Sequence, residues 1–460
     1  MRAGVEDGGG RGAQCERASW WGGTGVCWLL IALGFGGALA LGPLPEAAPW
    51  SWVLLAGAGL AWWAALVRAR RRPPAWGWVW VGALVLRALA LAGEPQTSDD
   101  LERYVWEGAL VLEGRSPYAW APDDPALAAV RERRPATYAA MNNTAVSAAY
   151  PPLTQALCAL AVAAAGGPER ADEGRSRLAL RLLYGAFDLA LLWPLGWLLR
   201  ARGLPPGLAL AWGWCPLVAL EFAGAAHFDA AGLFFTCLGL ALWGRGRALG
   251  AGLSLGAAAL IKFLPVVALV FLRGAKASRA WSAALLCALL AYAPLLWLDG
   301  GSAGLFRGLS TYGLAWESTS LLYRFVEPPL ELLFARGSGW IGPHSVGRGL
   351  VVLAFGATLL VARWRRVEPF AATGWALGAF VVLSPTLHPW YVCWIVPFLC
   401  LRPLRGAPLL VALAPLFYWP LRAWRADAVW VEPAWLWPAV ALPCLLLCAL
   451  DAARPLEVRA

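Results

Sequence analysis

Two adjacent carboxylates, Asp99 and Asp100, begin the longest polar interval of an otherwise apolar sequence. The stretch that contains them reads Ser98-Asp99-Asp100-Leu101-Glu102-Arg103-Tyr104-Val105-Trp106-Glu107-Gly108. Charged groups are costly beside or within a bilayer, so they mark candidate functional sites. Partial burial raises the pKa of a carboxylate and suits it to act as a general base near neutral pH. Asp99 and Asp100 are therefore the predicted catalytic residues.

The same carboxylates also have a structural explanation. Serine and aspartate are common at helix N-caps, and acids are common in the first helical turn. Residues 100–113 are expected to form a short amphipathic helix, because Leu101, Tyr104 and Val105 recur near one face. Adjacent like charges raise one pKa of a pair. The sequence leaves open which of the two carboxylates would be the base.

Positive side chains elsewhere can bind a phosphate, arginine in a bidentate manner and lysine as a point charge. The candidates are Arg103, Lys262, Arg324 and His388. Three of them also have a structural explanation. Arg103 can pair with Glu107 four residues on, and Lys262 can extend its charge to the membrane interface, at the cytoplasmic end by the expected topology. His388 precedes a proline, where a capping residue is also expected.

Several polar residues interrupt apolar runs. Glu221, His227 and Asp229 cluster across one expected helix end, where a hydrogen-bonded structural cluster is the preferred interpretation over a metal site. Arg181 and Asp188 share a helix face and are expected to tie helices together. The ten cysteines lack metal-ligand spacing. No cofactor is predicted, and a divalent metal is left open.

The elements that position these residues follow from composition. The chain has 460 residues, of which 60% are hydrophobic and only 14% charged. Apolar runs of the roughly 20 residues that span a bilayer recur throughout, which predicts an all-α polytopic transmembrane helical bundle of roughly 12–14 spans. The net charge of +10 is explained by arginines at helix ends, so membrane lipids are expected partners and nucleic acid is not.

The arginine cluster between Arg68 and Arg72 orients the bundle, since short cytoplasmic loops are rich in basic residues. It predicts extracytoplasmic loops, with short amphipathic helices, at about 94–149 and 299–345. Residues 1–22 are expected to be a disordered cytoplasmic N-terminus, and residues 23–460 one transmembrane domain. Middle spans are expected at about 150–166, 178–199, 205–222, 228–244, 249–272 and 280–298. This count of spans places the pairs Arg200/Arg202 and Arg245/Arg247 on the extracytoplasmic side, although basic residues are expected in the cytoplasmic loops.

The loop motif, followed by Pro117-Tyr118 and Tyr150-Pro151-Pro152, resembles the first extracytoplasmic loop of the GT-C superfamily. It is most similar to bacterial polyprenol-phosphate-mannose-dependent mannosyltransferases. The resemblance extends to Cys215-Pro216-Leu217-Val218-Ala219-Leu220-Glu221, His227-Phe228-Asp229, Lys262-Phe263-Leu264-Pro265 and His388-Pro389-Trp390-Tyr391. Cys215 and Glu107 depart from the asparagine and aspartate that family members often carry.

The resemblance implies an inverting hexosyltransferase, with mannose as the expected sugar, in the bacterial cytoplasmic membrane. It would take a polyprenyl-phosphate donor and a lipid or glycan acceptor, with an aspartate as the general base. The predicted substrate-binding residues are Arg103, Tyr104, Glu107, Tyr150, Lys262, Arg324, His388 and Tyr391.

Two other classes of protein are alternatives to a glycosyltransferase. In a secondary transporter or lipid flippase, Arg181, Asp188 and Lys262 would line a pathway, but transporters commonly show two matching halves, and no internal repeat is found. A structural subunit without catalysis explains the hydrophobicity but not the paired carboxylates or His388.

Overall fold

The computed structural model describes residues 21–42, 49–94, 97–167, 173–334, 342–427 and 429–453. Helices dominate these ranges, and no strand is assigned in them; two isolated bridges join Arg115 to Asp299 and Ser318 to Thr386. The all-α prediction is confirmed. Of residues 1–22, which were expected to be disordered, residues 1–20 lie outside the described ranges, and residues 21 and 22 begin a helical turn, Trp21–Gly25.

Within the described ranges, five helical segments are long and apolar enough to cross a membrane. They are Gly23–Ala40 (containing α2, Val26–Ala40), Trp50–Ala69 (α3), Glu173–Arg200 (α9 and α10), Ala277–Trp297 (containing α16, Ala277–Tyr292) and Pro343–Trp364 (α19). A sixth candidate, formed by Pro206–Gly213 and Pro216–Gly224, bends by 54° at its break. The chain is therefore a polytopic membrane protein, and the count of 12–14 spans stays a prediction.

The described residues also form six shorter apolar helices. They are α4 (Trp76–Ala92), α8 (Pro152–Ala164), α13 (Asp229–Gly244), α14 (Ala248–Ile261), α20 (Pro369–Leu383) and α24 (Leu436–Ala452). Prolines explain two of the interruptions, because proline lacks the N–H that a continuing helix needs. The expected span 205–222 breaks before Pro216, and 249–272 breaks at Lys262, three residues before Pro265.

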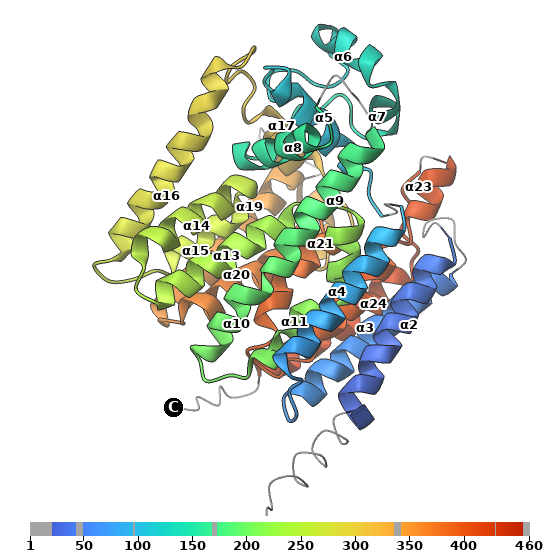
Figure 1. Cartoon of the computed structure of the whole chain (residues 1–460), viewed down its shortest axis with the longest axis vertical. Coiled ribbons are helices and arrows are strands. Elements are labelled where there is room, and N and C mark those ends of the chain that lie inside the picture. The colour runs from blue at the N-terminus through green and yellow to red at the C-terminus, as the bar shows by residue number, and fades with distance from the viewer. Residues whose placement is uncertain are drawn as a thin grey trace, which may run out of the picture.

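A layer of helices covers one end of the bundle (Figure 1). It contains α5 (Asp100–Leu112), α6 (Ala128–Arg133), α7 (Pro135–Ala140) and α8. The predicted amphipathic helix at 100–113 is thus confirmed. Gly108 brings α5 against α8, since a Cβ there would lie 2.6 Å from the Cys158 carbonyl group.

The prediction that residues 150–166 span the membrane is wrong. Tyr150 before α8 and Arg177 after it line the same cavity, so the chain returns to the end of the bundle from which it started. Arg177 pairs with Glu102 of α5 at 2.7 Å, which fixes the start of α9 in that layer. With only 13 residues, α8 is about 20 Å long, shorter than the hydrocarbon core of about 30 Å.

Because α8 does not cross the bundle, the helices that follow it run in the opposite direction from the one expected from the sequence. The segment α9–α10 now runs away from the cavity to Arg200 and Arg202, at the opposite end of the molecule (Figure 1). Arg202 pairs there with Glu368, Arg245 lies over the Trp197 ring, and other arginines bond to backbone carbonyls of the same end. We call this the arginine end; it includes Arg70, Arg202, Arg245, Arg273, Arg363 and Arg402.

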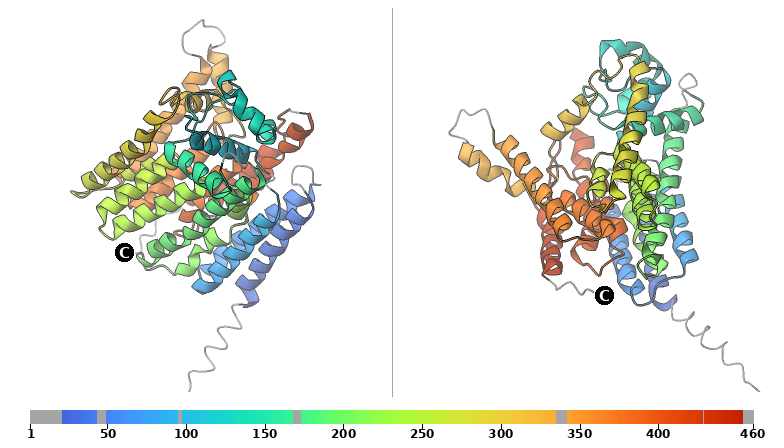
Figure 2. Two further views of the ribbon diagram at one scale, coloured as in Figure 1. Left: turned by 45° about the horizontal axis from the view of Figure 1, so that its top comes forward. Right: turned by 90° about the vertical axis from the view of Figure 1, so that its left-hand side faces the viewer.

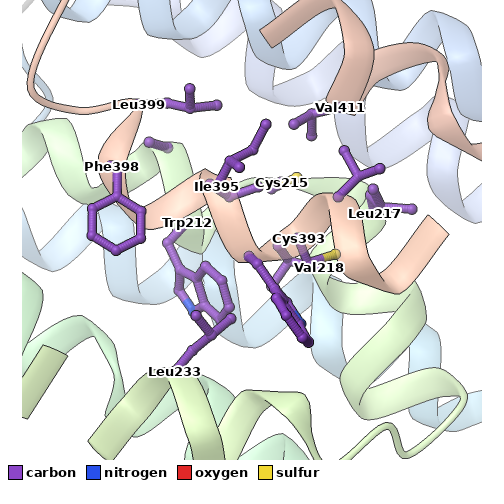
Figure 3. Packing of buried hydrophobic residues seen from close by; sticks show 14 of the residues in the cluster. Trp212, Cys215, Leu217, Val218, Leu233, Cys393, Ile395, Phe398, Leu399 and Val411 are labelled. Carbon is purple, nitrogen blue, oxygen red and sulfur yellow. The ribbon is translucent and has the colours of Figure 1, made fainter. Parts of the chain in front are cut away.

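The middle of the bundle holds a continuous apolar core. Figure 3 shows part of it, in which Trp212, Leu217 and Val218 lie with Cys393 and Ile395. The cysteines here are free and buried, as expected of small hydrophobic residues.

Buried arginines cross-link this core. Arg87 of α4 pairs with Asp188 of α9 through two contacts of 2.8 Å. Arg181 of α9 donates to the carbonyls of Ala90 and Gly93 at the end of α4. The prediction that Arg181 and Asp188 tie helices together is confirmed.

Candidate active site

A cavity of about 860 Å³ opens within the covered end of the bundle. Its wall comes from the start of α5, segment 142–150, α17 (Arg307–Ala315), segment 386–391 and α23 (Leu421–Asp427). Six of the residues singled out from the sequence line it: Asp99, Asp100, Arg103, Tyr150, His388 and Tyr391. The other four, Tyr104, Glu107, Lys262 and Arg324, are not among its lining residues.

The carboxylate pair does not serve as the side-chain cap of α5. The Ser98 hydroxyl accepts from the Asp100 backbone N–H at 3.1 Å, while the Asp99 side chain makes no capping hydrogen bond. Instead, the side-chain amide of Asn142 donates to Asp99 Oδ1 at 2.5 Å and to Asp100 Oδ1 at 3.4 Å. Ser98 therefore accepts the hydrogen bond at the start of the helix, and both carboxylates lie at the cavity wall.

Burial raises the pKa values of both carboxylates. Loss of solvent raises the pKa of Asp99 above its ordinary value. It also raises the pKa of Asp100 to about 6, and the neighbouring Asp99 charge adds to the effect. Hydrogen bonding by Asn142 and the charges of Arg103 and Lys262 act in the opposite direction on Asp100 without cancelling the rise. The pair can therefore exchange a proton near neutral pH.

Arg103 is occupied by protein acceptors. Its guanidinium donates to three backbone carbonyls of segment 142–146, at 2.8 to 3.4 Å, and to Glu107 at 3.2 Å. Glu107 also accepts from Gln155 of α8 at 2.8 Å. The alternative that Arg103 pairs with Glu107 is confirmed, and both residues fasten segment 142–146 to α5 and α8.

Lys262 lies at the cavity end of α14, behind the lining. Its ammonium group pairs with Asp229 at 2.7 Å and lies 4.3 Å from the centroid of the Tyr391 ring. The expectation that Lys262 lies at the opposite end of the bundle from the Asp99–Asp100 loop is therefore wrong. It depended on counting α8 as a span, and removing that span reverses the direction of α14.

Aromatic side chains pack against one another in the part of the cavity wall formed by segment 386–391 and α17. His388 and His227 each stack on Trp390, with ring centroids 4.2 and 4.0 Å away. The hydroxyl groups of Tyr391 and Tyr312 lie 2.5 Å apart, which joins segment 386–391 to α17.

Protein partners satisfy part of the buried cluster beneath this wall, while His227 Nε2 and Asp229 Oδ2 are buried without a hydrogen bond. Tyr418 donates to both Glu221 oxygens, each at 2.9 Å, and the Tyr104 hydroxyl lies 3.5 Å from His227 Nδ1. Asp229 Oδ1 accepts from Lys262 and from the Trp394 indole at 2.7 Å. Glu221, His227 and Asp229 therefore take part in a buried hydrogen-bonded cluster, as expected.

Two further groups lie at the rim. Arg324 lies 4.0 Å from Glu432 and over the Trp437 ring. Among the described residues, one trio could hold a metal ion geometrically, formed by Glu317, Glu327 and His344. Its members already face one another, with His344 Nε2 3.2 Å from Glu317 and Arg348 at the same distance from that carboxylate.

Sequence reasoning missed several residues of the wall. They are Asn142, Arg177, Tyr312, Trp390, Trp424 and Trp430. Trp390 belongs to the motif His388-Pro389-Trp390-Tyr391, so its place between two predicted site residues could have indicated it. Asn142 lies 43 residues from Asp99, and no periodicity or spacing links the two positions.

A helical membrane bundle with paired carboxylates in the wall of a largely apolar cavity is the arrangement expected of a membrane-embedded glycosyltransferase. Comparison with known proteins narrows the class. Residues 21–278 match the N-terminal domain of the alpha-(1->6)-mannopyranosyltransferases, and residues 344–429 match the MptB C-terminal domain. The first match covers more than half of the chain, so the chain belongs to the alpha-(1->6)-mannopyranosyltransferase family.

A curated relative agrees with this assignment. The chain is 26% identical over 378 residues to alpha-(1->6)-mannopyranosyltransferase A of Mycobacterium tuberculosis (strain ATCC 25618 / H37Rv). The match covers 76% of this chain and 68% of the relative. The protein is therefore a mannosyltransferase of GT-C type, as the loop motif implied, and the transporter and structural-subunit alternatives are set aside.

Proposed function

We propose that this protein transfers mannose from a polyprenyl-phosphate donor to a hydroxyl group of a lipid or glycan acceptor, with formation of an α-1,6 linkage. The reaction takes place at the extracytoplasmic face of the bacterial cytoplasmic membrane. The observation that carries the proposal is the pair Asp99 and Asp100, held by Asn142 at the cavity wall, where burial raises the pKa of Asp100 to about 6.

The chemistry is a single displacement with inversion. The acceptor hydroxyl oxygen attacks C1 of mannose while a carboxylate of the pair removes the hydroxyl proton. The bond from C1 to the phosphate oxygen breaks, and the lipid phosphate leaves with the bonding electrons. An α-linked product then requires a β-linked donor. A positioned base of this kind typically contributes 10²- to 10⁴-fold to the rate.

Charge developing on the leaving phosphate needs positive or hydrogen-bonding groups close by. His388 lines the cavity, and Lys262 lies directly behind the Tyr391 ring. His388 has the position for this role. Arg103 also lines the cavity, but its guanidinium already donates to four protein acceptors, and the Lys262 ammonium pairs with Asp229.

The surroundings of the cavity suit a lipid-linked donor. Helix α17 contributes Tyr312 to the wall, while Phe306 and Leu314 at the same helix are 55% and 67% exposed. In Figure 2, α18 (Glu327–Phe334) and the start of α19 stand away from the bundle beside this region. An apolar chain attached to a phosphate in the cavity can leave along this lipid-facing surface.

The orientation follows from charge. Short basic loops stay in the cytoplasm, and the arginine end lies opposite the cavity. With α8 removed from the count, the pairs Arg200/Arg202 and Arg245/Arg247 agree with the cluster at Arg68–Arg72. A cytoplasmic arginine end leaves the cavity on the other side of the membrane.

The test is transfer from radiolabelled polyprenyl-phosphate mannose in membranes containing the protein, followed by separation of lipid and glycan products. We expect label in an acceptor only when the carboxylate pair is intact. A nucleotide-activated mannose serves as the alternative donor. Direct use of that donor in the absence of lipid-linked mannose would contradict the proposal.

A further inference from the structure

We propose that Asn142 is a positioning residue for the carboxylate pair, and that Arg103 acts through Asn142 rather than on the donor phosphate. This inference rests on the proposed function, because it takes Asp99 and Asp100 as the source of the base. It assigns a role to an asparagine that is remote from both carboxylates in the sequence and reaches both in the fold.

The first observation is one amide shared by two carboxylates. Asn142 Nδ2 lies 2.5 Å from Asp99 Oδ1 and 3.4 Å from Asp100 Oδ1. Both neighbours only accept when ionised, so the NH₂ group, with its two protons, is the end of the amide that faces them. Neighbouring carboxylates repel each other, and one donor between them directs one oxygen of each toward the same point.

The second observation is that Arg103 secures the segment that carries this amide. Arg103 is 8% exposed, and it donates to the carbonyls of Asn142, Asn143 and Val146. Asn143 has a φ of 48°, a left-handed conformation that asparagine tolerates better than most residues. The sharp turn is therefore held from inside by a guanidinium that uses four of its five N–H groups on protein.

Charged and titratable groups from several elements also face the pair. Those that affect the pKa of Asp99 or Asp100, or are affected by them, are Glu102, Arg103, Tyr104, Tyr150, Lys262, Tyr312 and Arg425. Asn142 differs from all of these because it donates a hydrogen bond to both carboxylates. A hydrogen bond to the ionised form lowers the pKa of a carboxylate. Removing the amide therefore raises the pKa of the base and reduces its ionised fraction at acidic pH.

The experiment uses the full-length protein in membranes, with polyprenyl-phosphate mannose as the donor, and measures kcat/KM between about pH 5 and 8. For Asn142→Ala, we expect the acidic limb of the profile to move to higher pH. If the limb moves by about one pH unit, the ionised fraction of the base below it falls roughly 10-fold. Asn142→Asp, which has nearly the same size, introduces a third carboxylate and should move the limb further.

Arg103→Lys tests the second half of the proposal. Lysine keeps the charge but not the planar fork, so the variant should move the limb in the direction of Asn142→Ala with little change in donor KM. The double variant should be no worse than Asn142→Ala alone, since residues that act through one another are not additive. A raised donor KM with an unmoved limb would make Arg103 a phosphate ligand and overturn its assignment.

A control variant and the two carboxylate variants distinguish failure of the role proposed for Asn142 from failure of the proposed function. Asp123→Asn, which changes an exposed carboxylate of the same loop, should keep the wild-type profile. An equal loss for Asn142→Ala at every pH, or no loss, would overturn the positioning role. Full activity of Asp99→Asn and of Asp100→Asn in the same assay would instead contradict the proposed function itself, so the two failures are distinguishable.

Discussion

His388 stacks on Trp390 with ring centroids 4.2 Å apart and ring planes 1° apart, and His227 stacks on the same indole at 4.0 Å. Aromatic contacts of this kind contribute about 0.5–1.5 kcal/mol beyond burial. The stack fixes the plane of the His388 imidazole at the cavity wall, so that its ring nitrogens need little reorganisation before they meet a ligand.

Replacement of His388 should therefore reduce turnover more than it reduces folding. For His388→Ala we expect kcat/KM to fall by a factor equivalent to about 2–4 kcal/mol, the loss typical of a preorganised donor to developing charge. Trp390→Phe keeps a ring beneath the imidazole and should cost less. Steady-state kinetics on protein of verified monodispersity measures both. Full turnover in a normally accumulating His388→Ala variant would remove His388 from the site.

Asn substitutions of the paired carboxylates remove charge and keep size. If Asp99 or Asp100 is the base, its Asn variant should accumulate normally and lose turnover by about 100-fold or more. Asp123→Asn, at an exposed position of the same loop, is the matched control. If the two residues served only the helix start, each change would cost about 1 kcal/mol of stability or less, and activity would persist. Activity retained in the double Asn variant would end the proposed mechanism.

The pH dependence of the wild-type enzyme follows from the raised pKa of Asp100, about 6. A base must be ionised, so kcat/KM should rise with pH through about 6 and then level off. The charge of Asp99 is the second cause of the raised pKa of Asp100, after burial. Residual activity in Asp99→Asn should therefore show an acidic limb at lower pH. A profile that is flat from pH 5 to 8 would exclude a buried carboxylate as the base.

Membrane orientation can be measured by labelling single cysteines in a cysteine-free background with an impermeant maleimide in whole cells. Ala136→Cys in exposed α7 lies in the layer over the cavity, whereas Ala201→Cys lies at the arginine end. We expect the first to label in intact cells and the second only after permeabilisation. Labelling in the reverse order would place the cavity in the cytoplasm.

The buried pair Arg87–Asp188 should carry a large share of the stability of the core. Both side chains are at most 2% exposed, and Arg87→Met leaves an unpaired carboxylate in an apolar environment. Loss of one partner of such a pair costs about 3–5 kcal/mol. Arg133→Ala, which breaks the half-exposed pair with Glu113, should cost about 1 kcal/mol or less. Thermal unfolding in detergent compares the two, and equal changes in Tm would contradict the argument.

Composition and local pattern alone determined much of this protein. Runs of apolar residues of membrane-spanning length require helices, because lipid offers backbone groups no other hydrogen-bond partner. The helix beginning at Asp100 followed from the recurrence of Leu101, Tyr104 and Val105 on one face. These features depend on neighbours a few residues apart, which a sequence displays directly.

Tertiary structure alone decided the direction of the middle helices and the partners of the carboxylates. An apolar run at 150–166 predicts a helix, but tertiary contacts, among them the packing of Gly108 on Cys158 and the pairing of Arg177 with Glu102, keep α8 in the covering layer. Asn142 reaches Asp99 across 43 residues through a turn that Arg103 holds. Contacts between positions so far apart depend on how helices pack, and a single sequence carries no local signal of that packing.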